Sequence, residues 1–148
     1  MKGMAVHEDT ISIRTQGNGH VKDITPLLAE CIRRSGIKSG IANVFCAGST
    51  GSLTTTEYEP GAVRDINELL DRLIPPTPPG PPWGDYFHHE TWHDNNGHSH
   101  LRASILGAHI TVPIRNGRPL LGTWQQVVFI DFDTHPRNRQ LAVTIIGE

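Results

Sequence analysis

Six prolines fall within residues 75–82, near the middle of a 148-residue chain. Proline lacks a backbone N–H and has a fixed φ, so such a run neither continues a helix nor donates hydrogen bonds to a sheet. We therefore expect residues 75–82 to form an extended surface loop. A ligand for an SH3- or WW-type domain is the alternative. Because structured sequence follows at once, a stiff connector inside one domain is the better interpretation.

Three segments before this loop are predicted to be strands. Residues 10–14 alternate polar and apolar side chains, as a half-buried strand does. Residues 37–46 offer Ile41, Val44 and Phe45 for burial, and residues 53–56 are rich in β-branched side chains.

Two helices are predicted in the same half of the chain. The first has Thr25 as N-cap, Pro26 at its first helical position and Gly36 as its stop. Pro60 opens the second. Apolar residues recur at helical spacing in both segments: Leu27, Leu28, Cys31 and Ile32, then Val63, Ile66, Leu70 and Leu73.

The second half is rich in strand signals. Asn116-Gly117 is a strong hairpin signal because both residues tolerate positive φ. The candidate strands are residues 101–105, 110–114, 120–121, 127–132 and 140–146. Two helices with strands at both ends favour a single α+β domain over residues 1–148, with a mixed, mostly antiparallel sheet or sandwich, and not a doubly wound fold.

Composition excludes several classes. A net charge of −2 gives no basic footprint, so we expect no nucleic-acid partner. No apolar run approaches the length of a membrane span, and the N-terminus lacks the apolar stretch of a signal peptide. We therefore expect a cytoplasmic protein without a membrane partner, in which Cys31 and Cys46 are free, buried thiols.

Five of the nine histidines lie within residues 88–100. Imidazole is a ligand for Zn²⁺ and related divalent ions. If the segment is extended, His98 and His100 point to the same face, and His88 or His89 folds back as a third ligand. Three ligands leave an open position, as catalytic sites do, and Asp94 either ligates or orients a histidine. A solvated loop and a subunit contact are the alternatives.

Several other segments carry candidate functional groups. The Gly48–Ser52 loop, with Ser49 and Thr50, offers backbone N–H groups and hydroxyls to an anion, although it is equally a turn or bulge. Glu57 is a candidate acid or base, or else a solvated strand end. Trp124 is a candidate core residue, which leaves Gln125 free to bond a ligand. Further candidates are Arg64, Arg137 and Arg139 for phosphate, and Asp65 at a helix start.

Eight blocks of this sequence, in order from about residue 36 onward, resemble the YjbQ-like family, the secondary thiamine-phosphate synthase type. The blocks are residues 48–50, 56–61, 96–104, 106–107, 112–113, 117–118, 121–126 and 131–133. The resemblance implies a compact α+β fold, a homotrimer, and histidines around a metal in a cleft near a subunit boundary. It also implies displacement of pyrophosphate from an aminopyrimidine by the ring nitrogen of a thiazole phosphate.

The resemblance also assigns residues. His88 and His100 fall on the family's histidine positions, and His98 does so in a closer subset of members. The remaining matches to family motif positions are Glu57, Asp65, Trp124 and Gln125. Many members carry His-Thr-Ser-Ala where this chain has residues 48–51, so Gly48 replaces a histidine.

Together these observations lead to a first hypothesis of a metal-dependent enzyme acting on a small phosphorylated substrate. Its metal ligands are His88, His98 and His100, with zinc the first expectation. Its catalytic candidates are Glu57, Asp65 and Gln125, and its substrate-binding candidates are Ser49, Thr50, Arg64, Trp124, Arg137 and Arg139. The alternatives are a trimeric metal- or metabolite-binding protein without turnover, and an assembly module whose histidines pack around a trimer axis.

Overall fold

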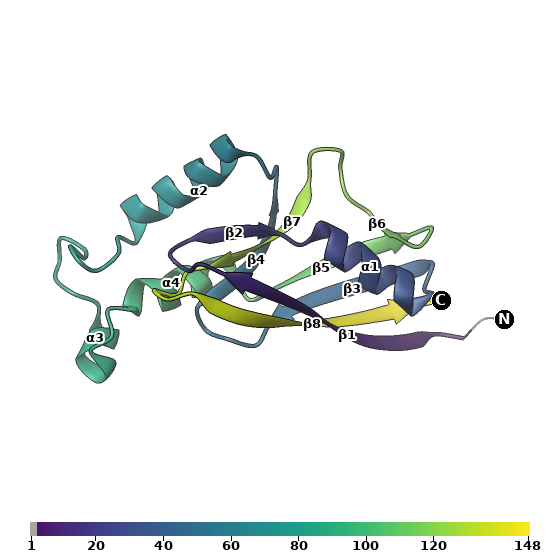
Figure 1. Ribbon diagram of the computed structural model, residues 1–148, viewed down its shortest axis with the longest axis horizontal. Coiled ribbons are helices and arrows are strands. Elements are labelled where there is room, and N and C mark those ends of the chain that lie inside the picture. The colour runs from purple at the N-terminus through teal and green to yellow at the C-terminus, as the bar shows by residue number, and fades with distance from the viewer. Residues whose placement is uncertain (1–2) are drawn as a thin grey trace.

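The computed structural model describes residues 3–148, which form two antiparallel sheets and four helices (Figure 1). The larger sheet has the order β1 (Ala5–Thr15), β8 (Arg137–Gly147), β3 (Ser39–Cys46), β5 (His109–Arg115) and β6 (Arg118–Pro119). The smaller sheet has the order β2 (His20–Asp23), β7 (Gln126–Asp131) and β4 (Gly51–Thr56). The helices are α1 (Thr25–Ser35), α2 (Pro60–Leu73), α3 (Phe87–Trp92) and α4 (Gly97–Leu106).

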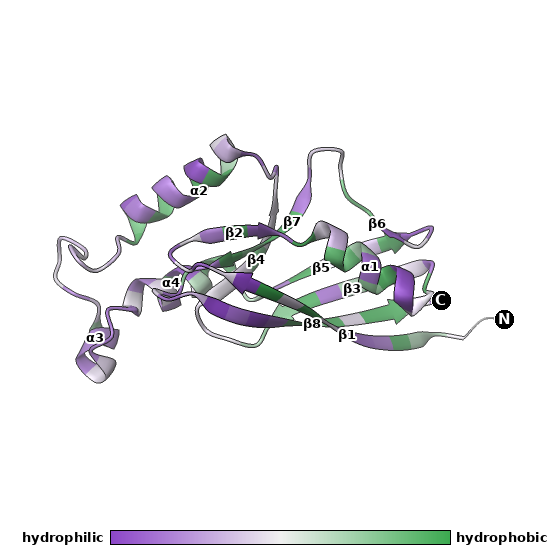
Figure 2. Ribbon diagram, in the orientation of Figure 1, coloured by the Kyte–Doolittle hydropathy of each residue, from purple (hydrophilic) through white to green (hydrophobic). Residues whose placement is uncertain are grey.

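Strand β7 lies between two hydrophobic cores. Val127 and Phe129 pack into the core shared by α1 and the strands of both sheets. Val128 and Ile130 point the other way and pack with residues of α2 and α4. Alternation along a strand sends successive side chains to opposite faces, so a continuously apolar strand of this kind is buried on both sides. Figure 2 shows hydrophobic residues along these strands, whereas α3 is mainly hydrophilic.

The α+β prediction is confirmed, and most predicted elements occur with small changes in their bounds. Residues 10–14 lie inside β1, which pairs with β8 over its whole length. The proline run contains no helix or strand, as predicted. Both cysteines are free and buried, and burial raises the pKa of the Cys31 thiol to about 11. No helix within residues 3–148 is long and apolar enough to cross a bilayer.

The start of α1 differs from the prediction by one residue. Ile24 is the N-cap, and Thr25 is already helical. The Thr25 hydroxyl instead accepts a hydrogen bond from the N–H of Val127, so it ties the helix to β7. The stop was predicted correctly, because Gly36 takes the left-handed conformation with φ of 72°.

Some predicted burial was wrong. Leu27 and Leu73 lie at the margins of their helical stripes and are 43% and 61% exposed. Ile41 and Phe45 are also exposed, because β3 turns Ala42, Val44 and Cys46 into the core and its alternate residues outward.

Residues 101–105 form part of helix α4 and not the predicted strand. Its buried residues are Gly97, His98, Ser99, Arg102 and Ala103, which follow the helical period. The buried face is largely polar: the Ser99 hydroxyl donates to the carbonyl of Phe132, and Arg102 donates to the carbonyl of Ile74. The sequence of α4 therefore lacks the apolar periodicity by which the other helices were predicted. The strand predicted at 120–121 was also wrong, since β6 ends at Pro119.

A close approach of backbones fixes the register of β3 and β8. Gly40 and Gly147 face each other across these strands. A Cβ atom built on Gly40 would lie 2.0 Å from the carbonyl oxygen of Ile146, and one on Gly147 would lie 2.0 Å from that of Ser39. Neither position has room for a side chain.

We expect Gly40→Ala to lower the free energy of unfolding by about 1–3 kcal/mol, because the two strands must separate to admit the methyl group. Urea denaturation midpoints measure the change. Gly3→Ala is the matched control, since a Cβ there meets nothing within 4 Å. Equal midpoints for the two variants would contradict the close-packing argument.

Candidate metal and anion site

Two of the five clustered histidines meet at one end of the molecule. His88 on α3 and His100 on α4 have ring centroids 4.3 Å apart. Asp94, in the turn between these helices, places a carboxylate oxygen 3.3 Å from Nδ1 of His88. Burial first, and the neighbouring His88 second, lower the pKa of His100, which favours the neutral imidazole that binds metals.

His98 lies apart from this pair. Because it is in a helix and not a strand, its side chain points about 200° around the axis from that of His100. Its ring is buried, with its centroid 6.4 Å from that of Tyr86. Burial, followed by the charge of Arg102, lowers the pKa of His98 to about 4. The extended geometry on which the three-histidine prediction depended is therefore wrong.

Within residues 3–148, no three His, Cys, Asp or Glu side chains are placed to hold one metal ion. The His88–His100 pair nevertheless has the chemistry of a partial site. Nδ1 of His88 is buried and has no hydrogen-bond partner in the described chain, since the Asp94 contact meets the distance but not the angle of a hydrogen bond. Two imidazoles therefore fit two positions of an ion, and the others must be filled from outside this set of side chains.

The loop between β3 and β4 lies beside the histidine pair. It lines a cleft of about 370 Å³ together with residues of α4 and the turn after it. The cleft is lined by Gly48, Ser49, Gly51, His100, Ala103, Ser104, Gly107 and Ala108. Ser49 is exposed there, and its substrate-binding role stays a prediction. Thr50 is buried and uses its hydroxyl inside the protein.

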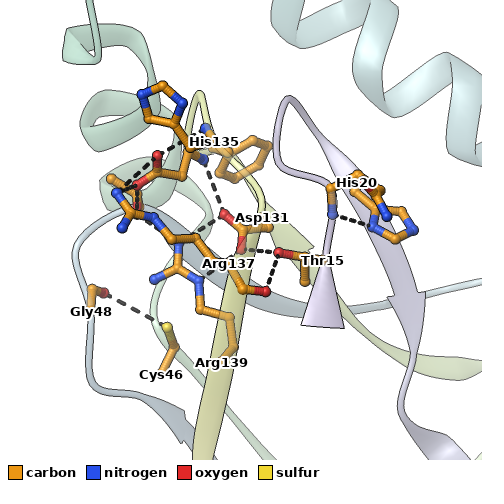
Figure 3. Close-up of polar contacts among 12 residues, drawn as sticks. Thr15, His20, Cys46, Gly48, Asp131, His135, Arg137 and Arg139 are labelled. Carbon is orange, nitrogen blue, oxygen red and sulfur yellow. Dashed lines mark hydrogen bonds and ion pairs between the residues drawn. The ribbon is translucent and has the colours of Figure 1, made fainter. Parts of the chain in front are cut away.

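Arg139 lies next to Gly48 of this loop and is held in an ion pair with a buried carboxylate (Figure 3). Its Nε and Nη2 donate to the two carboxylate oxygens of Asp131 at 2.7 and 2.8 Å. Nη2 also donates to the Thr50 hydroxyl at 2.8 Å, and the Thr15 hydroxyl donates to Asp131. Asp131 is completely buried, whereas the Arg139 side chain keeps a small exposed part.

A second carboxylate holds the other predicted arginine of this strand. Arg137 lies 3.2 Å from Asp133, which also accepts hydrogen bonds from the N–H of His135 and the hydroxyl of Thr50. Burial raises the pKa of Asp133, but these hydrogen bonds and the charge of Arg137 outweigh it, and the pKa is lowered overall. The sequence analysis did not select Asp131 or Asp133. The sequence feature that could have revealed them is a pair of carboxylates directly after the apolar residues of a predicted strand.

The remaining predicted residues lie in a different part of the molecule. Gln125 donates to the Thr55 hydroxyl at 3.2 Å and accepts from the N–H of Gly122, so its amide is already bonded. Trp124 is 71% exposed and not part of the core. Glu57 follows β4 and is exposed. In residues 3–148 these side chains make no polar contact with the histidine cleft, which lies toward the α3 end (Figure 1).

The predicted helix residues of α2 do not join either group. Asp65 is exposed on the helix surface. Arg64 donates to Glu68 at 2.9 Å, one turn along the same helix. Both are surface positions in this chain.

The fold and the cleft define a two-sheet α+β protein with paired histidines at one end. Residues 9–148 match the family model described as UPF0047 protein YjbQ-like, and the chain belongs to this family. A UPF0047 protein of Methanothermobacter thermautotrophicus is 37% identical over 145 residues, which cover 98% of this chain and 95% of that protein. A UPF0047 protein of Methanocaldococcus jannaschii is 36% identical and covers 92% and 91%, respectively.

Solved structures show the same fold. The crystal structure of a YbjQ-like protein of unknown function from Sulfolobus solfataricus P2 has a TM-score of 0.87 and 32% identity. The match covers 99% of this chain and 100% of that chain. A Clostridium acetobutylicum protein of the YjbQ/UPF0047 family has a TM-score of 0.81 and 36% identity, covering 93% and 98%.

The buried position of His98 predicts a pH-dependent stability. The unfolded chain binds a proton near pH 6.5, whereas folded His98 does so only near pH 4. The contribution of His98 to the free energy of unfolding is therefore fully present above pH 6.5. It falls by about 3 kcal/mol as the pH drops toward 4. Urea unfolding at pH 7 and pH 4.5 tests this. His98→Gln is expected to lose less stability between these pH values than the wild type, and an unchanged pH dependence would contradict the assignment.

Proposed function

We propose that this chain is a metal-dependent enzyme that acts on a small phosphorylated substrate in the cleft beside His88 and His100. The observation that carries the proposal is the pairing of two imidazoles, one of which, His100, lines a cleft. The opposite wall is a glycine- and hydroxyl-rich loop backed by Arg139. Such a cleft pairs a partial metal site with donors for an anion.

The metal would be held by His88 and His100, with zinc as the first candidate. Asp94, close to Nδ1 of His88, would fix the orientation of that ring. A bound divalent ion would neutralise negative charge on the leaving phosphate or pyrophosphate. His98 has a supporting role in this proposal, since its buried ring lies near Tyr86 and apart from the His88–His100 pair.

The side chains of this protein would bind and orient the substrate. The Ser49 hydroxyl lies at the cleft and would donate a hydrogen bond to a phosphate oxygen. The family resemblance supports attack of a thiazole ring nitrogen on an aminopyrimidine pyrophosphate as the first reaction to test. Glu57 is the candidate acid or base. Because it lies outside the cleft of its own chain, its participation requires a second copy or a rearrangement.

We further propose that the chain assembles as a homotrimer. The outer face of the larger sheet carries an apolar row across four strands, because Val6 pairs with Ile146, which pairs with Ile41, which pairs with Pro113. All four side chains are exposed. Burial of such a row against another copy is favourable. Native mass spectrometry tests the assembly.

A non-catalytic metal- or metabolite-binding protein is the second candidate. One observation favours it: Glu57 and Gln125 make no polar contact with the histidine cleft in the described chain. A binding protein needs the cleft but not these residues.

Metal content tests the histidine pair. We expect about one divalent ion per wild-type chain, and loss of most of it in His88→Ala and His100→Ala, because a single imidazole is a weak ligand set. His93→Asn is the matched control from the same segment, since asparagine tolerates the left-handed backbone of position 93 and the His93 ring packs against that of His89. His98→Ala separates a two-histidine from a three-histidine site. Metal-free wild type after reconstitution would overturn the proposal.

Turnover separates the enzyme from the binding protein. If the chain is an enzyme, Glu57→Gln is expected to reduce turnover of aminopyrimidine pyrophosphate and thiazole phosphate by about 10²–10⁴-fold while metal is retained. Steady-state formation of thiamine phosphate measures this. Metal binding without turnover in the wild type would remove the synthase reaction and leave the binding protein.

A further inference from the structure

One nitrogen of the partly buried Arg139 is not used by the ion pair. Nε and Nη2 form the fork with Asp131, and Nη2 also bonds Thr50. Nη1 makes no hydrogen bond within residues 3–148, and the atom is not fully buried. It is therefore reached by solvent, although the arginine side chain is only 14% exposed. Its two N–H donors are held in place with no acceptor.

Nη1 points toward Gly48, at the wall of the cleft (Figure 3). A Cβ atom built on Gly48 would lie 3.1 Å from Nη1 and 3.7 Å from the sulfur of Cys46. The space that any side chain at position 48 would occupy is therefore the space in front of these donors. Gly48 does not take the left-handed conformation, so its backbone does not require glycine.

An anion bound at Nη1 of Arg139 would lie beside Gly48, in the same cleft that His100 lines. Gly48, Ser49 and His100 line the same cleft. Arg139 cannot turn away, because the two carboxylate bonds fix the guanidinium plane. Fixed guanidinium donors match the oxygens of a phosphate group and need no reorganisation on binding.

We propose that Nη1 of Arg139 is an oxyanion subsite of the cleft, and that the absence of a side chain at Gly48 makes it accessible. The ligand class is a phosphate or pyrophosphate group, bound by Nη1 with the Ser49 hydroxyl beside it. The inference deepens the proposed function and rests on it for the identity of the ligand. The subsite itself requires no metal.

The subsite gives position 48 a role in specificity. Any side chain there would crowd Nη1, since its Cβ atom would lie 3.1 Å from that nitrogen. Glycine instead leaves a guanidinium that stays charged at every working pH open to the ligand.

Binding of inorganic phosphate and pyrophosphate to metal-free protein tests the subsite, with isothermal titration calorimetry as the measurement. We expect Gly48→Ala to raise the Kd for both about tenfold, which corresponds to about 1.4 kcal/mol, because the methyl group crowds Nη1. Gly3→Ala controls for the substitution. Ser104→Ala controls for the cleft wall, since its hydroxyl is turned to the carbonyl of His100. Both controls are expected to keep the wild-type Kd.

Two results would overturn the subsite: no phosphate binding by the wild type, or the same Kd in Gly48→Ala and wild type. A thermal midpoint for Gly48→Ala equal to that of Gly3→Ala shows that a weaker Kd does not come from unfolding. The metal proposal fails on a different measurement, the metal content of the wild type. Phosphate binding that depends on Gly48 in a protein that takes up no metal would retain the subsite and discard the metal.

Discussion

The buried ion pair of Asp131 and Arg139 joins the parts of the protein on which the cleft depends. Asp131 ends β7, Arg139 lies on β8, and Thr15 at the end of β1 donates to the same carboxylate. The pair therefore connects the two sheets, and through Thr50 it also fixes the loop after β3. A buried charge left without its partner costs roughly 3–5 kcal/mol, so this connection is hard to alter by a single substitution. The remaining arginine nitrogen lies next to Gly48, which lines the cleft.

The two walls of the cleft are supported in different ways. The Gly48–Thr50 loop is attached to the ion pair through Thr50. Helix α4 is joined to this loop through Phe132, because the Ser99 hydroxyl donates to the Phe132 carbonyl and the Phe132 N–H donates to the carbonyl of Thr50. His88 has less support. Its short helix packs against α4, and the preceding loop is closed by hydrogen bonds of Tyr86 to Pro75 and of Thr77 to Asp85. His100 is therefore held by a helix that packs on the core, whereas His88 lies on a short helix that follows a long loop.

The strands and the first two helices could be predicted because their buried faces are apolar and repeat at a regular period. Helix α4 could not, since its buried face contains His98, Ser99 and Arg102, which resemble a solvated surface in sequence. The same error placed His98 and His100 on one face. The pairing of His88 with His100 depends on the turn at His93, which takes a left-handed conformation that composition does not reveal. The choice of Arg139 as an anion-binding candidate stays a prediction, and its partner Asp131 depends on contacts between residues far apart in the chain.

The loose attachment of α3 bears on how such a family diversifies. Insertions, deletions and substitutions in residues 75–85 alter the path that leads to His88 without touching either core. The reach of this arm can therefore change without a change in the Asp131–Arg139 ion pair, and a substitution in the arm leaves the packing of the two sheets intact.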